Sequence, residues 1–126
     1  MNISTLNALG TIINTSYGQS STRGNDKGYA LKYSMTESGV KLSFNALVQF
    51  ASEKSLQDQV SNLKNESNQL IKDDINRVIS EFKESTGESL TLKNINDRDN
   101  IELVSYSVHS PIRRAVYRRE LFYSID

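Results

Sequence analysis

Four of the seven arginines of this 126-residue chain lie close together near its C-terminus. Guanidinium groups that neutralise phosphates, beside tyrosines that stack on bases, are one pattern of a nucleic-acid site. In a strand, however, alternate side chains point to opposite faces, so Arg113 and Arg119 are expected on one side and Arg114 and Arg118 on the other. Contact with a partner protein, or ion pairing with acids of this chain, is therefore favoured over nucleic acid.

His109 is the one histidine of the chain, and Ser110 follows it. Neighbouring residues on a strand point to opposite faces, so these two cannot form a nucleophile and base pair. The sequence has no Gly-x-Ser-x-Gly motif and no cysteine, which excludes a thiolate zinc site and a cysteine nucleophile. We therefore predict no catalytic residue and a protein that is not an enzyme.

Oxygen-bearing side chains alternate between residues 94 and 102, where Asp97, Asp99 and Glu102 could bind calcium. An EF-hand loop also requires a glycine at its sixth position and a following helix, and both are missing. Asn- and Asp-rich turns are common for local reasons. We predict no metal and no cofactor.

The first 22 residues contain no Asp, Glu, Lys or Arg. A linker rich in Gly and Ser, residues 18–28, separates this stretch from the rest of the chain. An uncharged segment of moderate apolar content is suited to lie against another protein, so residues 1–28 are predicted to form an extended arm that adds to a neighbouring subunit. Its expected contact residues are Ile3, Leu6, Leu9, Ile12 and Ile13.

Residues 29–126 are predicted to form one domain. Apolar residues alternate over 29–36 and again over 40–50 on either side of a short turn, which predicts a β-hairpin. A helical pattern follows, with Ser52 as its N-cap and Gly87 as its C-cap.

Alternating runs return after the helix and predict short strands over 90–92, 101–109 and 115–125. Strands on each side of one long helix favour an α+β fold with a mostly antiparallel sheet. The residues expected in the core or at its edge are Tyr33, Leu42, Phe44, Ile75, Val78, Phe82, Val104, Tyr106, Leu121 and Tyr123.

The predicted helix is about 50 Å long, which exceeds what a domain of this size needs to cover its sheet. Its C-terminal half carries a wide apolar stripe, typical of a helix packed on a sheet. Its N-terminal half carries a narrow seam of Leu56, Val60 and Leu63. The seam predicts contact with a second helix, from a copy of the chain or from another protein.

These features together favour a structural or assembly protein that binds copies of itself, other subunits, or both. The Asn-, Ser- and Thr-rich composition of the chain is similar in style to tailed-phage virion proteins of the tail, baseplate or neck. A small nucleic-acid-binding accessory protein and a small inhibitor of another protein are the alternatives. The 15 basic and 15 acidic residues balance, and the sequence shows no secretion signal and no membrane span. We expect a protein that is made in the cytoplasm and that, as a phage component, is incorporated into a virion.

Overall fold

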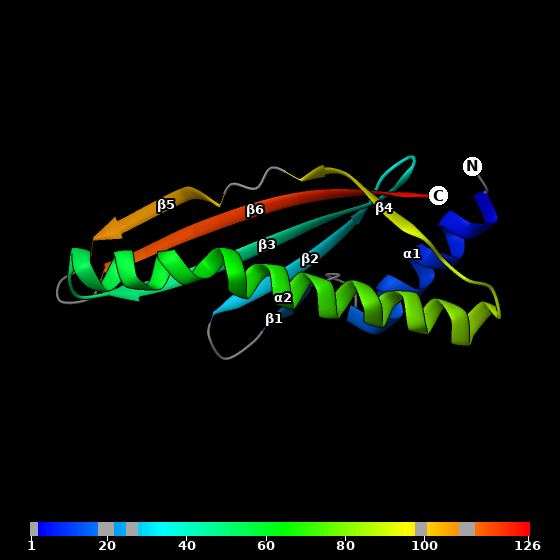
Figure 1. The fold of residues 1–126 in the computed structure, drawn as a ribbon, viewed down its shortest axis with the longest axis horizontal. Helices are drawn as coiled ribbons and strands as arrows, with labels where there is room; N and C mark the ends of the chain where they lie inside the picture. The colour runs from blue at the N-terminus through cyan, green and yellow to red at the C-terminus, as the bar shows by residue number, and fades with distance from the viewer. Residues whose placement is uncertain (1–2, 18–21, 25–27, 98–100, 109–112) are drawn as a thin grey trace.

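The computed structural model of this chain describes residues 3–17, 22–24, 28–97, 101–108 and 113–126. Its elements in chain order are α1 (Ile3–Tyr17), β1 (Thr22–Gly24), β2 (Tyr29–Met35), β3 (Gly39–Phe50), α2 (Glu53–Thr86), β4 (Leu92–Asp97), β5 (Glu102–Val108) and β6 (Arg113–Ile125). The long helix α2 lies along the sheet, and α1 lies beside the C-terminal half of α2 (Figure 1).

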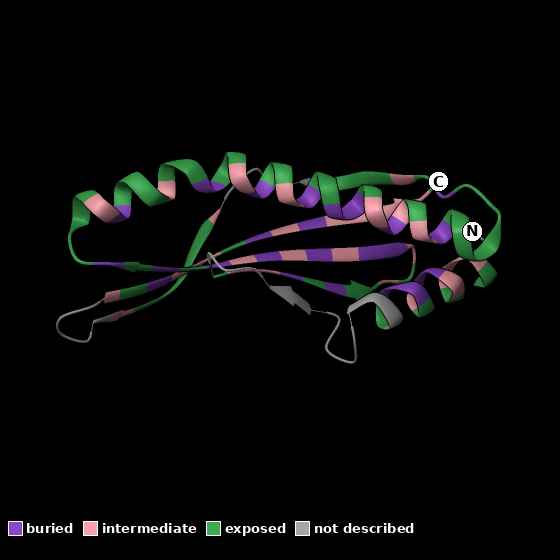
Figure 2. Ribbon diagram, turned by 90° about the horizontal axis from the view of Figure 1, so that it is seen from below, coloured by how far each residue is buried: buried purple, intermediate pink, exposed green. Residues whose placement is uncertain are grey.

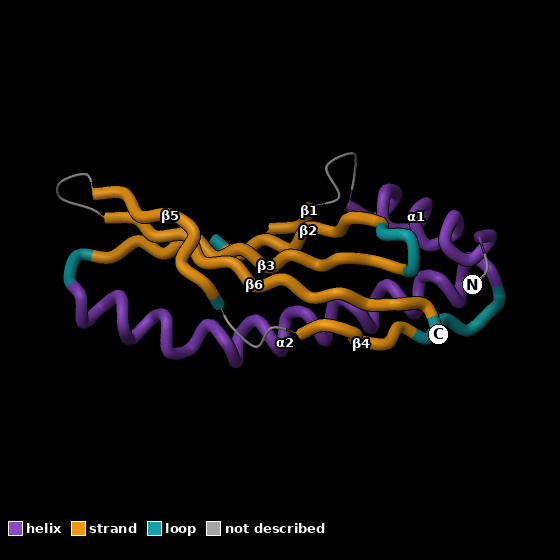
Figure 3. The backbone as a smooth tube through the Cα atoms, turned by 90° about the horizontal axis from the view of Figure 1, so that it is seen from above, coloured by secondary structure: helices purple, strands orange, loops and turns teal. Residues whose placement is uncertain are grey.

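The sheet is organised around β6. On one edge, β3 pairs with β6 over almost its whole length. On the other edge, β4 pairs with the C-terminal part of β6 and β5 with its N-terminal part, so two strands share one edge end to end (Figure 3). β2 continues the sheet beyond β3, and β1 lies beyond β2. Every pairing among these described strands is antiparallel, which confirms the predicted α+β class.

The predicted hairpin is formed by β2 and β3. Thr36 closes its turn, because its backbone N–H donates to the Gly39 carbonyl and its hydroxyl accepts from the Gly39 N–H, both at 3.0 Å. A glycine is needed at position 39 because β3 passes very close to β6. A Cβ atom there would overlap the carbonyl oxygen of Tyr123.

The ends of α2 follow the predicted caps. The Ser52 hydroxyl accepts from the Ser55 N–H at 3.2 Å and so satisfies a free donor of the first turn. Gly87 adopts a left-handed conformation with φ 77°, and its N–H donates to the Lys83 carbonyl at 2.8 Å. Neither of the two described helices is long and apolar enough to cross a membrane.

The two longest strands of the sheet run beneath most of the length of α2 (Figure 1). A helix of 34 residues is about 51 Å long, and β3 and β6, at 12 and 13 residues, each run for about 40 Å. Leu56 and Leu63 of the narrow seam are buried in the chain's own core, and Val60 packs partly buried against it. The seam therefore contacts this chain's sheet, and the expected contact with a second helix is wrong for these residues. Figure 2 shows the buried residues on the sheet-facing side of α2.

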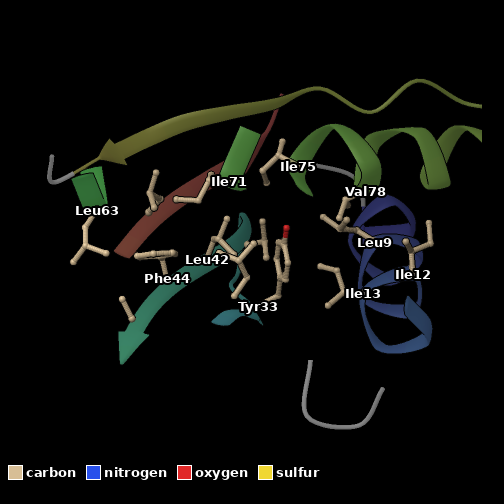
Figure 4. Packing of buried hydrophobic residues seen from close by; sticks show 14 of the residues in the cluster. Leu9, Ile12, Ile13, Tyr33, Leu42, Phe44, Leu63, Ile71, Ile75 and Val78 are labelled. Carbon is tan, nitrogen blue, oxygen red and sulfur yellow. The ribbon is translucent and has the colours of Figure 1, made fainter. Parts of the chain in front are cut away.

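The core lies between α2 and the sheet face that carries Phe44. Side chains of β2, β3 and β6 point from that face toward apolar residues of α2 (Figure 4). The predicted core residues that are buried there are Tyr33, Leu42, Phe44, Ile75, Val78, Phe82 and Leu121, and Tyr123 packs partly buried against them.

Residues 3–17 form a helix, not an extended arm. Leu9, Ile12 and Ile13 recur at helical spacing and are buried against the chain's own core, beside Val78 and Tyr33 (Figure 4). Leu6 and the strongly exposed Ile3 lie outside this buried set. The uncharged composition thus reflects a helix that packs within its own chain.

Candidate functional site

Arg119 is a buried residue of the core and not a surface contact. It is 3% exposed, and its Nη1 donates to Ser67 Oγ at 3.0 Å and to the side-chain oxygen of Asn68. The guanidinium thereby joins β6 to the middle of α2. The prediction that Arg119 contacts nucleic acid or a partner is wrong, because its charge lies inside the fold and its Nη1 already donates to Ser67 and Asn68.

The remaining three arginines of the cluster are divided between the two faces of the sheet. Arg113 lies on the helix-covered face, with its Nη1 3.6 Å from the Glu53 carboxylate. Arg114 and Arg118 are exposed on the open face, where the Arg118 Nε donates to the Asn45 side-chain oxygen at 2.9 Å. The alternation predicted from the sequence is confirmed by the pairing with β3. No continuous surface of four arginines exists for a nucleic-acid backbone.

The other candidate chemical groups remain unassembled in the described part of the chain. His109 and Asp99 lie outside the described residues, and Asp97 is the last residue of β4. Glu102 begins β5 and is exposed. Within the described ranges, no group of three or more His, Cys, Asp or Glu side chains is placed to hold a metal ion.

A second polar contact joins β2 to α2 inside the core. The Tyr33 hydroxyl, itself buried, donates to the buried carboxylate of Asp74. Arg77 approaches the other carboxylate oxygen of Asp74 at 3.2 Å and forms an ion pair with Glu81 at 2.6 Å, one turn along α2. The carboxylate of Asp74 thus has two partners, the Tyr33 hydroxyl and the Arg77 guanidinium, and the Tyr33–Asp74 contact has a structural role.

We expect Tyr33→Phe and Asp74→Ala each to lower the free energy of unfolding by about 1–3 kcal/mol, because each removes the buried hydrogen bond between these two side chains. The double variant should cost less than the sum, since the two residues share one contact. Urea unfolding of the four proteins measures this coupling. The adjacent Asp73→Ala, at an exposed position of α2, is the control and should change stability by less than about 0.5 kcal/mol. Additive single effects would contradict the contact.

Tyr29, at the start of β2, has a perturbed phenol. Its ring packs edge-on against Phe44, with ring centroids 5.4 Å apart. Burial, a hydrogen bond with Glu66 and the charge of that carboxylate raise the pKa of Tyr29 from 10.0 to about 12. Each of these causes disfavours the phenolate.

Alkaline titration should therefore show a tyrosine ionisation near pH 12 that is absent from Tyr29→Phe. Because the folded pKa lies above the unfolded value of about 10, the contribution of this group to stability is complete below pH 10 and is lost as the pH rises toward 12. Glu66→Gln should lower the Tyr29 pKa, and Glu84→Gln, elsewhere on α2, should leave it unchanged. Ultraviolet absorbance of the phenolate measures all four titrations. A Tyr29 that ionises near 10 would contradict the assignment.

The most exposed apolar part of the sheet is β5. It carries the exposed side chains Leu103, Val104 and Tyr106, at 54%, 47% and 45% exposure. β5 pairs with β6 on one side and, among the described residues, with no strand on the other. Val104 and Tyr106 were predicted in the core, and that prediction is wrong because a strand at the sheet edge is covered less than a central one. The Tyr106 ring reaches the covered face, where it meets Phe50 at a centroid distance of 5.8 Å.

Two further features mark the outer edge of β5. A β-bulge lies between Leu103 and Ser105, where the register with β6 shifts by one residue. A cleft of about 530 Å³ opens at the start of β5, between it and β4, and its lining includes Leu103, Val104, Arg118 and Phe122. The sequence could have indicated this surface through the apolar residues of 101–108, but alternation alone does not separate edge strands from central ones.

No protein-family model, curated protein or solved structure matches this chain.

Proposed function

We propose that this chain is a non-enzymatic structural protein that binds neighbouring subunits of a larger assembly through the open edge of β5. The observation that supports this proposal is the exposure of Leu103, Val104 and Tyr106 on one edge strand. Folded proteins usually protect an edge strand with charges, proline or a covering segment, because its backbone groups pair with other strands. Three large apolar side chains on such an edge are typical of a surface that another protein covers.

The structure also limits which surfaces of this chain are available to a neighbouring subunit. The buried part of α1 and the seam of α2 are already used inside the chain, so neither is available to a neighbour. The bulge at Leu103 protects part of the edge, and Ser105 to Val108 remain as a regular stretch for strand pairing. The version of this proposal in which the assembly is a tailed-phage virion is supported by the Asn-, Ser- and Thr-rich composition of the chain.

The test compares the wild-type chain with Val104→Lys, which places a charge on the proposed contact. Size-exclusion chromatography with light scattering gives the mass of the purified protein, and of a tagged chain isolated from its source cells. We expect the wild type in a species larger than one chain in at least one preparation, and the variant as a folded monomer in both. A wild type that is monomeric in both preparations would reject the proposal. Mass spectrometry of purified phage particles tests the virion version of the proposal, which requires this chain to be present in them.

A further inference from the structure

We infer that the β5 edge binds an extended segment of a partner protein that carries acidic side chains, and that this segment adds to the sheet as a further antiparallel strand. The inference rests on the proposed function and adds to it the chemical character of the partner segment. Strand addition draws affinity from backbone hydrogen bonds and specificity from the side chains beside the edge. Both contributions can be located from the register of the sheet.

The backbone of Tyr106 faces the open side of β5. Leu47 N–H donates to the Gly28 carbonyl at 2.9 Å, so the backbone of Leu47 points away from β6 and that of Val48 points toward it. Val48 lies across from Ala115, so the backbone groups of Ala115 point toward β3 and those of the next residue, Arg114, point toward β5. On β5, Arg114 pairs with Ser107. The backbone groups of Ser107 are thus used by β6. Those of Tyr106 and of Val108, the residues on either side of Ser107, point outward to an added strand.

The side chains beside this edge favour carboxylates. Arg114 is exposed on the open face and lies directly across from Ser107. Strands lie about 4.8 Å apart, and the small Ser107 side chain lets the long Arg114 side chain extend over β5 to the next strand. Within the described residues, Arg114 forms no ion pair. A carboxylate opposite Ser107 on the added strand would give Arg114 a charge-assisted hydrogen bond.

A second copy of this chain fits the edge less well. The one acid of β5 is Glu102, which lies on the far side of the bulge and is already opposite Arg118. Pairing of β5 with its own copy would therefore bring serine and apolar residues, and no carboxylate, to Arg114. The bulge would also interrupt the pairing on both strands. The positive charge of Arg114 beside this edge points to a different protein with an acidic strand.

Fluorescence anisotropy on the full chain tests the inference with a short fluorescein-labelled peptide of alternating valine and glutamate. We expect saturable binding of this peptide, and binding weaker by about tenfold or more for a peptide of alternating valine and lysine. A valine–glutamate peptide with N-methylated backbone should not bind, because strand addition needs its N–H groups. Equal binding of the acidic and basic peptides, or full binding of the N-methylated one, would overturn the inference.

Two matched protein variants locate the site. Arg114→Glu should weaken binding of the acidic peptide by about tenfold, the order expected when one charge-assisted hydrogen bond is lost. Lys32→Glu makes the same reversal from positive to negative charge at an exposed position of β2, across β3 and β6 from β5, and should change binding by less than about twofold. Thermal unfolding followed by circular dichroism verifies that both variants fold. An equal loss of peptide binding in the two variants would overturn the assignment of the site to the surface beside Arg114.

The oligomer and peptide experiments together separate failure of this inference from failure of the proposed function. A wild-type oligomer that Val104→Lys converts to a monomer, with no binding of the acidic peptide, overturns the acidic partner and leaves the assembly role in place. A wild type that is monomeric in every preparation and binds none of the peptides removes both.

Discussion

Leu9→Ala is expected to lower the free energy of unfolding by about 2–5 kcal/mol, although Leu9 lies in the uncharged N-terminal segment. Leu9 is fully buried, and it belongs to the same apolar cluster as Ile12, Ile13 and Val78. Its removal loses the transfer free energy of the side chain and leaves a cavity between α1 and the rest of the core. Urea unfolding of the isolated chain, followed by circular dichroism, measures the change.

Ile3→Ala is the matched control on the same helix, because Ile3 is 73% exposed. Its expected effect is less than about 0.5 kcal/mol. If residues 3–17 were instead an arm for a neighbouring subunit, Leu9→Ala would leave the stability of the isolated chain unchanged and affect only association. Equal and small effects of both substitutions would therefore restore the arm and contradict the packed helix.

Phe44→Ala is expected to cost about 3–5 kcal/mol, because Phe44 lies at the centre of the covered face. Its side chain is fully buried and contacts the Tyr29 ring. β3 has strands on both sides, β2 and β6, so little backbone movement can fill the space that the ring leaves. The midpoint of urea unfolding should fall, with little change in its slope.

Leu47→Ala tests the opposite face of the same strand. Leu47 lies three residues further along β3, is 42% exposed, and points to the face that α2 leaves open. We expect its replacement to cost less than about 1 kcal/mol. A similar cost at both positions would mean that the open face is also packed, which would contradict the layer arrangement. In that case the exposed positions of β5 would also need another explanation.

Local chemistry explains the parts of the fold that were predictable. The alternation over 29–50 specifies two strands with one apolar face, and the register of β2 with β3 follows it. Ser52 and Gly87 define the ends of α2 because capping depends on only a few neighbouring residues. The split of the arginines between two faces followed from the same period of two residues.

The errors arose where a side chain's partner is distant in the sequence. The spacing of Leu9, Ile12 and Ile13 suits a helix, yet nothing local shows that the surface beside α2 receives them. The narrow seam of α2 was predicted to contact another helix, and nothing local shows that this chain's own core buries Leu56 and Leu63. Arg119 looked like a surface arginine, and only the position of Ser67 above it shows that the guanidinium is buried.

The sequence by itself determined the α+β class, the hairpin, the caps of the long helix and the alternation of each strand, because these depend on the spacing of neighbouring residues. Only the tertiary structure decided which apolar surfaces are covered. It buried α1 within its own chain, and it placed β5 at the open edge of the sheet with Val104 and Tyr106 exposed. Strand order and helix docking depend on contacts between residues far apart in the chain, and the periodicity of a single segment is the same whether or not a neighbour covers it.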